Sequence, residues 1–228
     1  MNGADRKATG TSDLAARTLT AVVMVVVAGF ALCLGGWSWN LFVMLAAFGV
    51  LREWIALVRG FVASAPARGL WNAVGVVYIG FATAMLAFLR TDIFGAAAVL
   101  SVVGAVIATD VGAYFAGRVI GGPKIAPRIS PSKTWAGLAG GMIGATIVLV
   151  GTRGETPLWH AVLGGILLAA VAQAGDFFES WMKRRAGVKD SGALLPGHGG
   201  LFDRLDGLLA VLFVGGLLFV LPAILKYD

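Results

Sequence analysis

Residues 93–117 read IFGAAAVLSVVGAVIATDVGAYFAG, an apolar block whose one charged member is Asp110. The hydrocarbon core of a bilayer takes about 20 residues of helix, so a block of this length predicts a transmembrane helix. A carboxylate within such a block is energetically costly, which makes Asp110 a candidate functional residue.

The composition of the whole chain agrees with that local reading. Of its 228 residues, 58% are hydrophobic and 13% are charged, and the mean hydropathy is +0.87. A soluble domain of this size needs more polar surface than this. We therefore expect an all-α, polytopic integral membrane protein with about seven transmembrane helices, forming a single domain over 1–228. The expected spans lie at about 19–35, 38–58, 70–89, 93–117, 133–151, 157–182 and 205–225.

Cations are distributed unevenly between the two ends of these spans. With residues 1–18 as a cytoplasmic tail, all but three of the 18 cations fall on the cytoplasmic side, the exceptions being Arg90, Arg153 and Lys226. This bias predicts a bacterial-type inner membrane protein with its active site facing the cytoplasm. Topology and anionic lipid account for the net charge of +6, so we expect no nucleic-acid partner.

Glycines within two of the expected spans predict close packing between helices. Gly140, Gly141 and Gly144 lie in one span, and Gly164 and Gly165 lie in the next. Without a Cβ, residues at such positions allow two helix backbones to approach each other.

Carboxylates gather near the cytoplasmic ends of the spans. Asp176, Glu179, Ser180 and Lys183 share one helix face by their spacing, and Asp203 and Asp206 share another. A structural ion pair with a nearby cation explains any one of these carboxylates. Several carboxylates on one side of the membrane, however, favour a functional site. Such oxygens suit Mg²⁺ or Mn²⁺, with phosphate oxygens completing the coordination shell. The full set on this side is Glu53, Asp110, Asp176, Glu179, Asp190, Asp203 and Asp206.

Two cytoplasmic loops could bind the phosphates. Residues 191–200 read SGALLPGHGG, whose glycine N–H groups can point at an anion, and whose His198 has no core to fill. Residues 121–134 read GGPKIAPRISPSKT, where we expect Ser132 to cap the following helix and Lys133 to lie in its first turn. A cation there opposes the helix dipole unless it holds an anion. These features together predict metal-dependent phosphoryl transfer.

Residues 180–206, SWMKRRAGVKDSGALLPGHGGLFDRLD, resemble the signature of the phosphatidate cytidylyltransferase (CDP-diacylglycerol synthase) family. GDFFES at 175–180, DVGAYFAGR at 110–118 and SPSKT at 130–134 resemble further blocks of that family, so 110–210 is the expected catalytic region. The resemblance implies a Mg²⁺-dependent reaction of CTP with phosphatidic acid in the membrane, in which the lipid phosphate attacks the α-phosphorus. The products are CDP-diacylglycerol and pyrophosphate.

Residue roles follow from the same resemblance. It implies metal ligands at Asp176, Asp190, Asp203 and Asp206, of which the last three, with Lys189 and Asp110, are the expected catalytic residues. The implied substrate contacts are Lys133, Ser180, Lys183, Arg184, Lys189, His198, Gly199, Gly200 and Arg204. A second metal ion and a homodimer stay open. The family usually has a glutamate two residues after Lys-Thr, where this chain has Ala136.

Other functions make different demands on the sequence. A CTP-dependent lipid kinase and an ether-lipid cytidylyltransferase are the nearest alternatives and differ in their products. A CDP-alcohol phosphotransferase motif that begins at Asp206 fails at Val211, where the motif has arginine. A transporter predicts polar residues through the full membrane depth and a repeated half, neither of which is found here.

Overall fold

The computed structural model describes residues 3–195 and 199–224 as seven helices and one short hairpin. The first helices are α1 (Gly3–Leu34), α2 (Gly36–Phe61), α3 (Ala65–Leu89) and α4 (Gly95–Val119). The hairpin follows as β1 (Lys124–Ala126) and β2 (Ser130–Thr134). The chain continues through α5 (Trp135–Thr152), α6 (Leu158–Arg185) and α7 (Phe202–Ile224).

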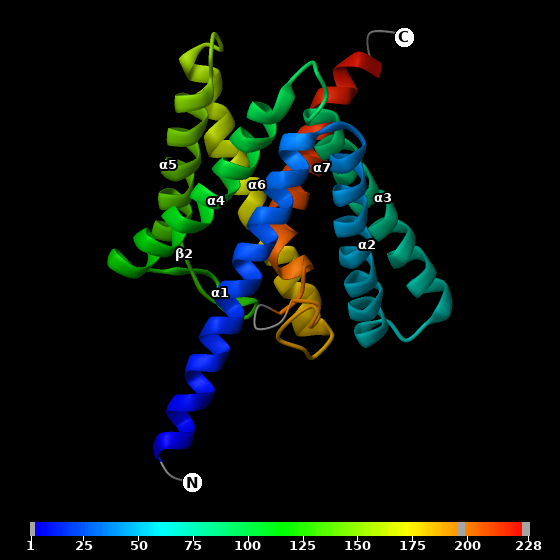
Figure 1. The fold of residues 1–228 in the computed structure, drawn as a ribbon, viewed down its shortest axis with the longest axis vertical. Coiled ribbons are helices and arrows are strands. Elements are labelled where there is room, and N and C mark those ends of the chain that lie inside the picture. The colour runs from blue at the N-terminus through cyan, green and yellow to red at the C-terminus, as the bar shows by residue number, and fades with distance from the viewer. Residues whose placement is uncertain (1–2, 196–198, 225–228) are drawn as a thin grey trace.

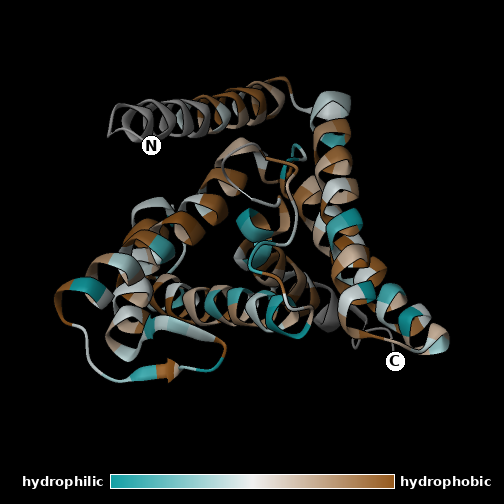
Figure 2. Ribbon diagram, turned by 90° about the horizontal axis from the view of Figure 1, so that it is seen from below, coloured by the Kyte–Doolittle hydropathy of each residue, from teal (hydrophilic) through white to brown (hydrophobic). Residues whose placement is uncertain are grey.

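The helices run roughly alongside one another and form a bundle (Figure 1). Five of them, α2 to α6, are long and apolar enough to cross a membrane, and Thr18–Leu34 within α1 is a shorter apolar helix. With α7, they correspond to the predicted set of about seven. The α2–α3 connection, the hairpin and the α6–α7 loop all lie at one end of the bundle (Figures 1 and 2). We call this end the loop end.

The N-terminal tail is the first departure from the predicted architecture. Residues 1–18 were predicted to precede the first span, and the apolar part of α1 does begin at Thr18, but the helix itself starts at Gly3. In Figure 2 the apolar part of α1 lies along one side of the other helices.

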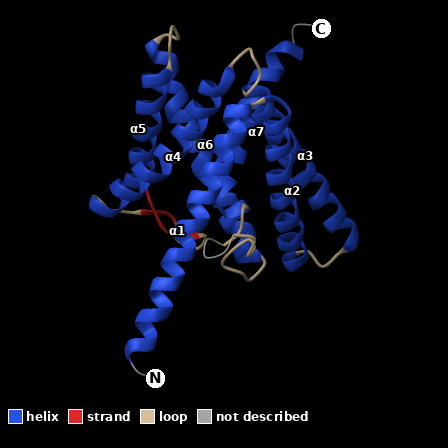
Figure 3. Ribbon diagram, in the orientation of Figure 1, coloured by secondary structure: helices blue, strands red, loops and turns tan. Residues whose placement is uncertain are grey.

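The hairpin is the second departure, because the sequence predicted no strands. β1 and β2 pair antiparallel, with Lys124 opposite Thr134 and Ala126 opposite Ser130 (Figure 3). The prediction that residue 133 begins a helix is wrong, since Lys133 lies in β2 and α5 begins at Trp135. The predicted cap at Ser132 is also wrong. Thr134 caps α5, its hydroxyl accepting a hydrogen bond from the N–H of Gly137 at 3.0 Å.

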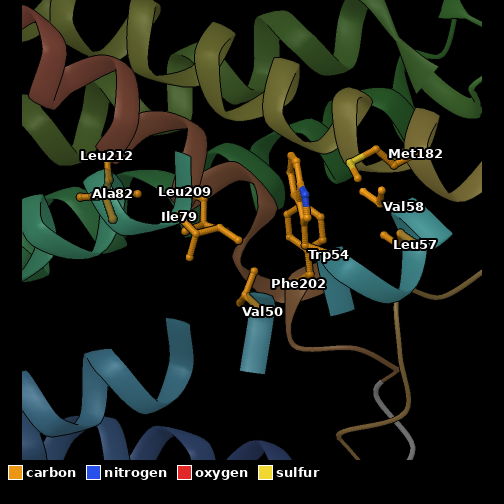
Figure 4. Close-up of a cluster of buried hydrophobic side chains, with 10 residues drawn as sticks. All are labelled: Val50, Trp54, Leu57, Val58, Ile79, Ala82, Met182, Phe202, Leu209 and Leu212. Carbon is orange, nitrogen blue, oxygen red and sulfur yellow. The ribbon is translucent and has the colours of Figure 1, made fainter. Parts of the chain in front are cut away.

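A tryptophan organises the core near the loop end. Trp54 of α2 is fully buried among apolar residues of α3, α6 and α7, which include Ile79, Met182 and Phe202 (Figure 4). Its indole N–H donates to the carbonyl of Trp71 at 3.1 Å, which satisfies the polar atom of an otherwise apolar side chain. The contact needs a glycine at 75, because a Cβ there would come within 2.3 Å of the indole nitrogen.

Glycines hold α4 against α5, as the sequence predicted. A Cβ on Gly140 would lie 2.5 Å from the carbonyl oxygen of Gly112, and one on Gly144 would lie 2.4 Å from that of Ala108. Gly165 makes an equally close approach to Thr146 of α5. The neighbouring Gly164 makes only an ordinary contact, so the prediction holds for one glycine of that pair. This packing fixes α4 and α5 on either side of the hairpin.

Candidate functional site

A buried glutamate ties the α6–α7 loop to α2. Glu53 is 5% exposed, and its carboxylate accepts hydrogen bonds from the backbone N–H groups of Leu201 at 3.0 Å and Phe202 at 2.7 Å. The hydroxyl of Ser191 donates to the same carboxylate at 2.9 Å. Glu53 thus acts as a cap for the start of α7, although it lies on another helix, and its negative charge favours that helix end.

Asp203 forms the centre of a first cluster, built from α6, α7 and the loop between them. One carboxylate oxygen accepts from the Lys183 ammonium at 2.6 Å. The other accepts from the N–H of Ser191 at 2.8 Å and the N–H of Gly200 at 2.9 Å, and it lies 2.9 Å from the hydroxyl of Ser191, whose single proton it shares with Glu53. Asp203 therefore fixes the loop, since both of its oxygens already have partners.

Lys183 joins this cluster to a second carboxylate. Its ammonium lies 2.5 Å from Glu179, one turn earlier on α6, and Glu179 is fully buried. Lys183 places a positive charge between Glu179 and Asp203. Without this cation, the two carboxylates would repel each other.

Glycines permit this dense packing of polar groups. A Cβ on Gly192 would lie 2.5 Å from a Glu53 oxygen, and one on Gly200 would lie 2.0 Å from the Ser191 hydroxyl. Gly199 has a φ of 80°, a conformation that residues with a side chain rarely adopt. Gly192 and Gly200 of the predicted anion loop are therefore required by the packing around Glu53 and Ser191.

A second cluster brings together carboxylates from three helices. Asp110 of α4, Asp176 of α6 and Asp206 of α7 lie close enough for their charges to act on one another, and Lys133 acts on the same group. Lys133 forms an ion pair with Asp176, whose other oxygen accepts from the Ser180 hydroxyl at 3.2 Å. Three carboxyl groups thus lie near one lysine, which pairs directly with Asp176.

The hairpin carries Lys133 to this cluster. β2 ends at Thr134, whose cap starts α5, so the lysine one residue earlier extends from the strand toward α6. Its ammonium lies 4.9 Å from the centre of the Phe177 ring, a cation–π contact that adds to the ion pair with Asp176. Asp176 and Phe177 therefore position the Lys133 ammonium independently of any bound substrate.

The remaining predicted residues lie around these clusters. Arg184 donates from its Nε to the carbonyl of Ile129 in the hairpin at 3.4 Å, and it is exposed. Lys189 and Asp190 are exposed on the loop, and Asp190 lies beside Gly199. Arg204 is exposed on the first turn of α7. His198 lies outside the described residues.

A divalent metal suits the second cluster better than the first. Asp203 was predicted to bind metal, yet its oxygens are occupied by Lys183, Ser191 and Gly200. Asp176 and Asp206 lie close enough for their charges to act on each other, an arrangement that a bound cation would stabilise. Among the described residues, no group of three His, Cys, Asp or Glu side chains is arranged to hold one ion. Mg²⁺ usually takes only one or two protein carboxylates beside water and substrate phosphates, so the donors fit.

Sequence reasoning assigned no site role to Glu53 or Ser191. Glu53 was noted only for its position near the cytoplasmic end of an early span, and its partners lie 138 to 149 residues away. Its charge within an apolar block was the signal that could have found it. No comparable signal marked Ser191.

The fold and the clusters define a helical membrane protein with a carboxylate and lysine site at the loop end of its bundle. The chain belongs to the cytidylyltransferase family, whose pattern matches residues 64–221. The matched range contains every described member of both clusters, and Glu53 of α2 lies before it.

Individual relatives cover most of the chain. A protein of Brucella abortus biovar 1 (strain 9-941) named phosphatidate cytidylyltransferase is 41% identical over 208 residues, which cover 84% of this chain and 76% of that protein. A protein of the same name from Brucella suis biovar 1 (strain 1330) is 41% identical over 204 residues, covering 82% and 74%. One from Mycobacterium leprae (strain TN) is 45% identical over 119 residues, covering 50% and 38%.

Proposed function

We propose that this protein transfers a cytidylyl group from CTP to phosphatidic acid, giving CDP-diacylglycerol and pyrophosphate. The observation that carries the proposal is the convergence of Asp110, Asp176, Asp206 and Lys133 at one end of the bundle. Relatives that align with more than four fifths of the chain carry the name of this activity. The site lies where a nucleotide from water and a lipid from the membrane can meet.

In the proposed reaction, an oxygen of the lipid phosphate attacks the α-phosphorus of CTP in line. A new P–O bond forms as the bond between the α-phosphorus and the bridging oxygen of pyrophosphate breaks, and pyrophosphate leaves with that electron pair. Negative charge accumulates on the phosphate oxygens during this step, so fixed cations nearby lower its barrier. Lys133 is the best placed of them, because Asp176 and Phe177 hold it beside the carboxylates.

Asp176 and Asp206 are the proposed ligands of a Mg²⁺ or Mn²⁺ ion, with Asp110 beside them. When bound, the ion supplies positive charge to the triphosphate oxygens and to the pyrophosphate leaving group. The first cluster helps to position these proposed ligands. Asp203 and Lys183 set the course of the loop and the start of α7, and thereby the position of Asp206 one turn later.

The proposed orientation places the loop end in the cytoplasm, where CTP is available. The hairpin and the α6–α7 loop lie together at this end (Figure 1). They contain basic residues such as Lys124, Arg128 and Lys189. A cytoplasmic location for these loops agrees with the positive-inside rule.

The decisive experiment follows the fate of each CTP phosphate. Purified protein in detergent is incubated with phosphatidic acid, Mg²⁺ and CTP labelled at either the α- or the γ-phosphorus. Cytidylyl transfer moves the α label into the lipid and the γ label into pyrophosphate. A CTP-dependent kinase would move the γ label into lipid and leave CDP, which would refute the proposal, as would the absence of turnover.

A variant control separates enzymatic turnover from contaminating activity. Glu155→Gln changes an exposed carboxylate far along the chain from both clusters, so it is expected to retain full activity. Asp176→Asn removes a charge that pairs with Lys133, and it is expected to abolish label transfer.

A further inference from the structure

An apolar cleft adjoins the candidate site. It has a volume of about 540 Å³ and lies between α1, α2 and α7, with contributions from α3 and α4. Its walls include Val27 of α1, Phe42 of α2, and Leu205, Leu208 and Leu212 of α7. The α7 residues follow the spacing of one helix face, so this face of α7 is turned into the cleft.

The cleft reaches the first turn of α7 and the α6–α7 loop. Among the described residues that line it, Arg204 alone is charged. Arg204 lies between Asp203 of the first cluster and Asp206 of the second along α7. Leu195 and Leu201 of the α6–α7 loop also line the cleft, and the N–H of Leu201 is bound by Glu53. The cleft therefore reaches the loop that Glu53 and the first cluster position.

Two other apolar clefts lack this combination. One lies against Trp54, Tyr78 and Phe213, and the other lies between α2 and α3. Neither is lined by a charged residue or by the α6–α7 loop. A ligand with an apolar chain and an anionic head is complementary to the first cleft and to neither of these.

We propose that the cleft between α1, α2 and α7 holds an acyl chain of phosphatidic acid, with Arg204 at its mouth contacting the lipid phosphate. This assignment rests on the proposed function. The volume lies within the range of small-molecule sites, and its lining has almost no polar groups for a sugar or a base to bind. An arginine can form two parallel hydrogen bonds to a phosphate, which suits a head group that must be held in register for attack.

A matched pair of valines tests the proposed acyl-chain site. Val27 lines this cleft and Val76 lines the cleft between α2 and α3, and the two are similarly exposed, at 49% and 53%. Val27→Trp displaces roughly two methylenes of a bound chain, so we expect the KM for long-chain phosphatidic acid to rise about tenfold. The KM for CTP and the activity on short-chain phosphatidic acid are expected to change little, and Val76→Trp to leave all three unchanged. Equal effects of both variants, or an effect of Val27→Trp that is independent of chain length, would overturn the assignment.

Arg204→Gln tests the head group. We expect the KM for phosphatidic acid to rise, the KM for CTP to stay constant, and the folded state to persist in thermal unfolding. A rise in the KM for CTP alone would place Arg204 at the nucleotide and refute its proposed contact with the lipid.

A binding experiment separates this proposal from the proposed function. Phosphatidic acid with a photoactivatable group in its acyl chain is cross-linked to the wild-type protein in vesicles without CTP, and the labelled peptides are identified by mass spectrometry. Labels on α1 and α7 that long-chain phosphatidic acid displaces, but diacylglycerol does not, support the cleft. If they occur without CTP turnover, only the proposed function fails. Turnover with labels confined to other helices contradicts the cleft alone.

Discussion

The carboxylate of Glu53 on α2 accepts the backbone N–H of Phe202 at 2.7 Å, and so fixes the start of α7 from 149 residues away. The same carboxylate binds the N–H of Leu201 and the hydroxyl of Ser191. A helix end needs partners for its free N–H groups, and here a side chain from another helix supplies them in a buried setting. The geometry of the candidate site therefore depends on a residue outside it.

Replacing Glu53 by alanine is expected to destabilise the protein as well as its site. The N–H groups of Leu201 and Phe202 lose their acceptor, whereas the Ser191 hydroxyl keeps Asp203. Each buried unsatisfied group costs about 1–3 kcal/mol, so the loss of unfolding free energy is roughly 2 kcal/mol or more. Thermal unfolding in detergent measures it as a lower Tm. Asp92→Ala, at an exposed turn, is the control and should leave the Tm unchanged. A Glu53→Ala protein with the wild-type Tm would show that the cap contributes nothing.

Replacing Asp203 or Asp206 by asparagine is expected to affect stability and activity differently. Asp203→Asn places an amide N–H₂ either against the Lys183 ammonium or against the N–H groups of Ser191 and Gly200, so both the Tm and the activity should fall. Asp206 accepts from the N–H of Gly207, a bond that asparagine keeps, so its Tm should stay near that of the wild type.

The activity of Asp206→Asn should be lost because a charged metal ligand is replaced by a neutral one. Binding of Mn²⁺ by electron paramagnetic resonance measures that loss without relying on turnover. If Asp206→Asn kept Mn²⁺ binding while a folded Asp203→Asn lost it, Asp203 would be the metal ligand and Asp206 would not.

This contrast shows what periodicity could and could not predict. Helical spacing correctly predicted that Asp176 meets Ser180 and that Glu179 meets Lys183, because both pairs are one turn apart on α6. Asp203 and Asp206 were predicted to act together because they are three residues apart. Both lie toward α6, but Asp203 meets Lys183 whereas Asp206 lies near Asp176, two turns earlier on that helix, so residues on one face of α7 belong to two different clusters.

Helical periodicity could predict neither the partners of Glu53 nor the formation of the hairpin. Contacts across 138 or more residues depend on how α2, α6 and α7 pack, which no local pattern encodes. The segment 121–134 contains three prolines and read as a loop. Its pairing depends on Gly121 and Gly122, both at positive φ, which turn the chain back after α4. The apolar blocks, in contrast, set the number and order of the helices because the membrane requires their length.

Lys133 is expected to matter for catalysis and little for stability. Its ion pair with Asp176 is partly exposed, so removing it should change the unfolding free energy by about 1 kcal/mol or less. Loss of a positioned cation from a phosphoryl-transfer site should lower kcat/KM for CTP by roughly a hundredfold. Lys124→Ala, in the same hairpin and exposed, is the matched control and should retain activity. Comparable losses in both variants would mean that the hairpin contributes only general positive charge.

Gly144 offers a test of the packing that places Asp110 beside α6. Gly144→Ala puts a Cβ 2.4 Å from the carbonyl oxygen of Ala108, a contact with backbone that no side-chain movement relieves. We expect α4 and α5 to separate, the Tm to fall, and activity to fall with it because Asp110 moves with α4. Gly151→Ala, on the same helix with open space around it, should be neutral or more stable by about 0.5–1 kcal/mol, since alanine is the better helix former. Equal Tm values for the two variants would show that close approach at Gly144 does not hold these helices together.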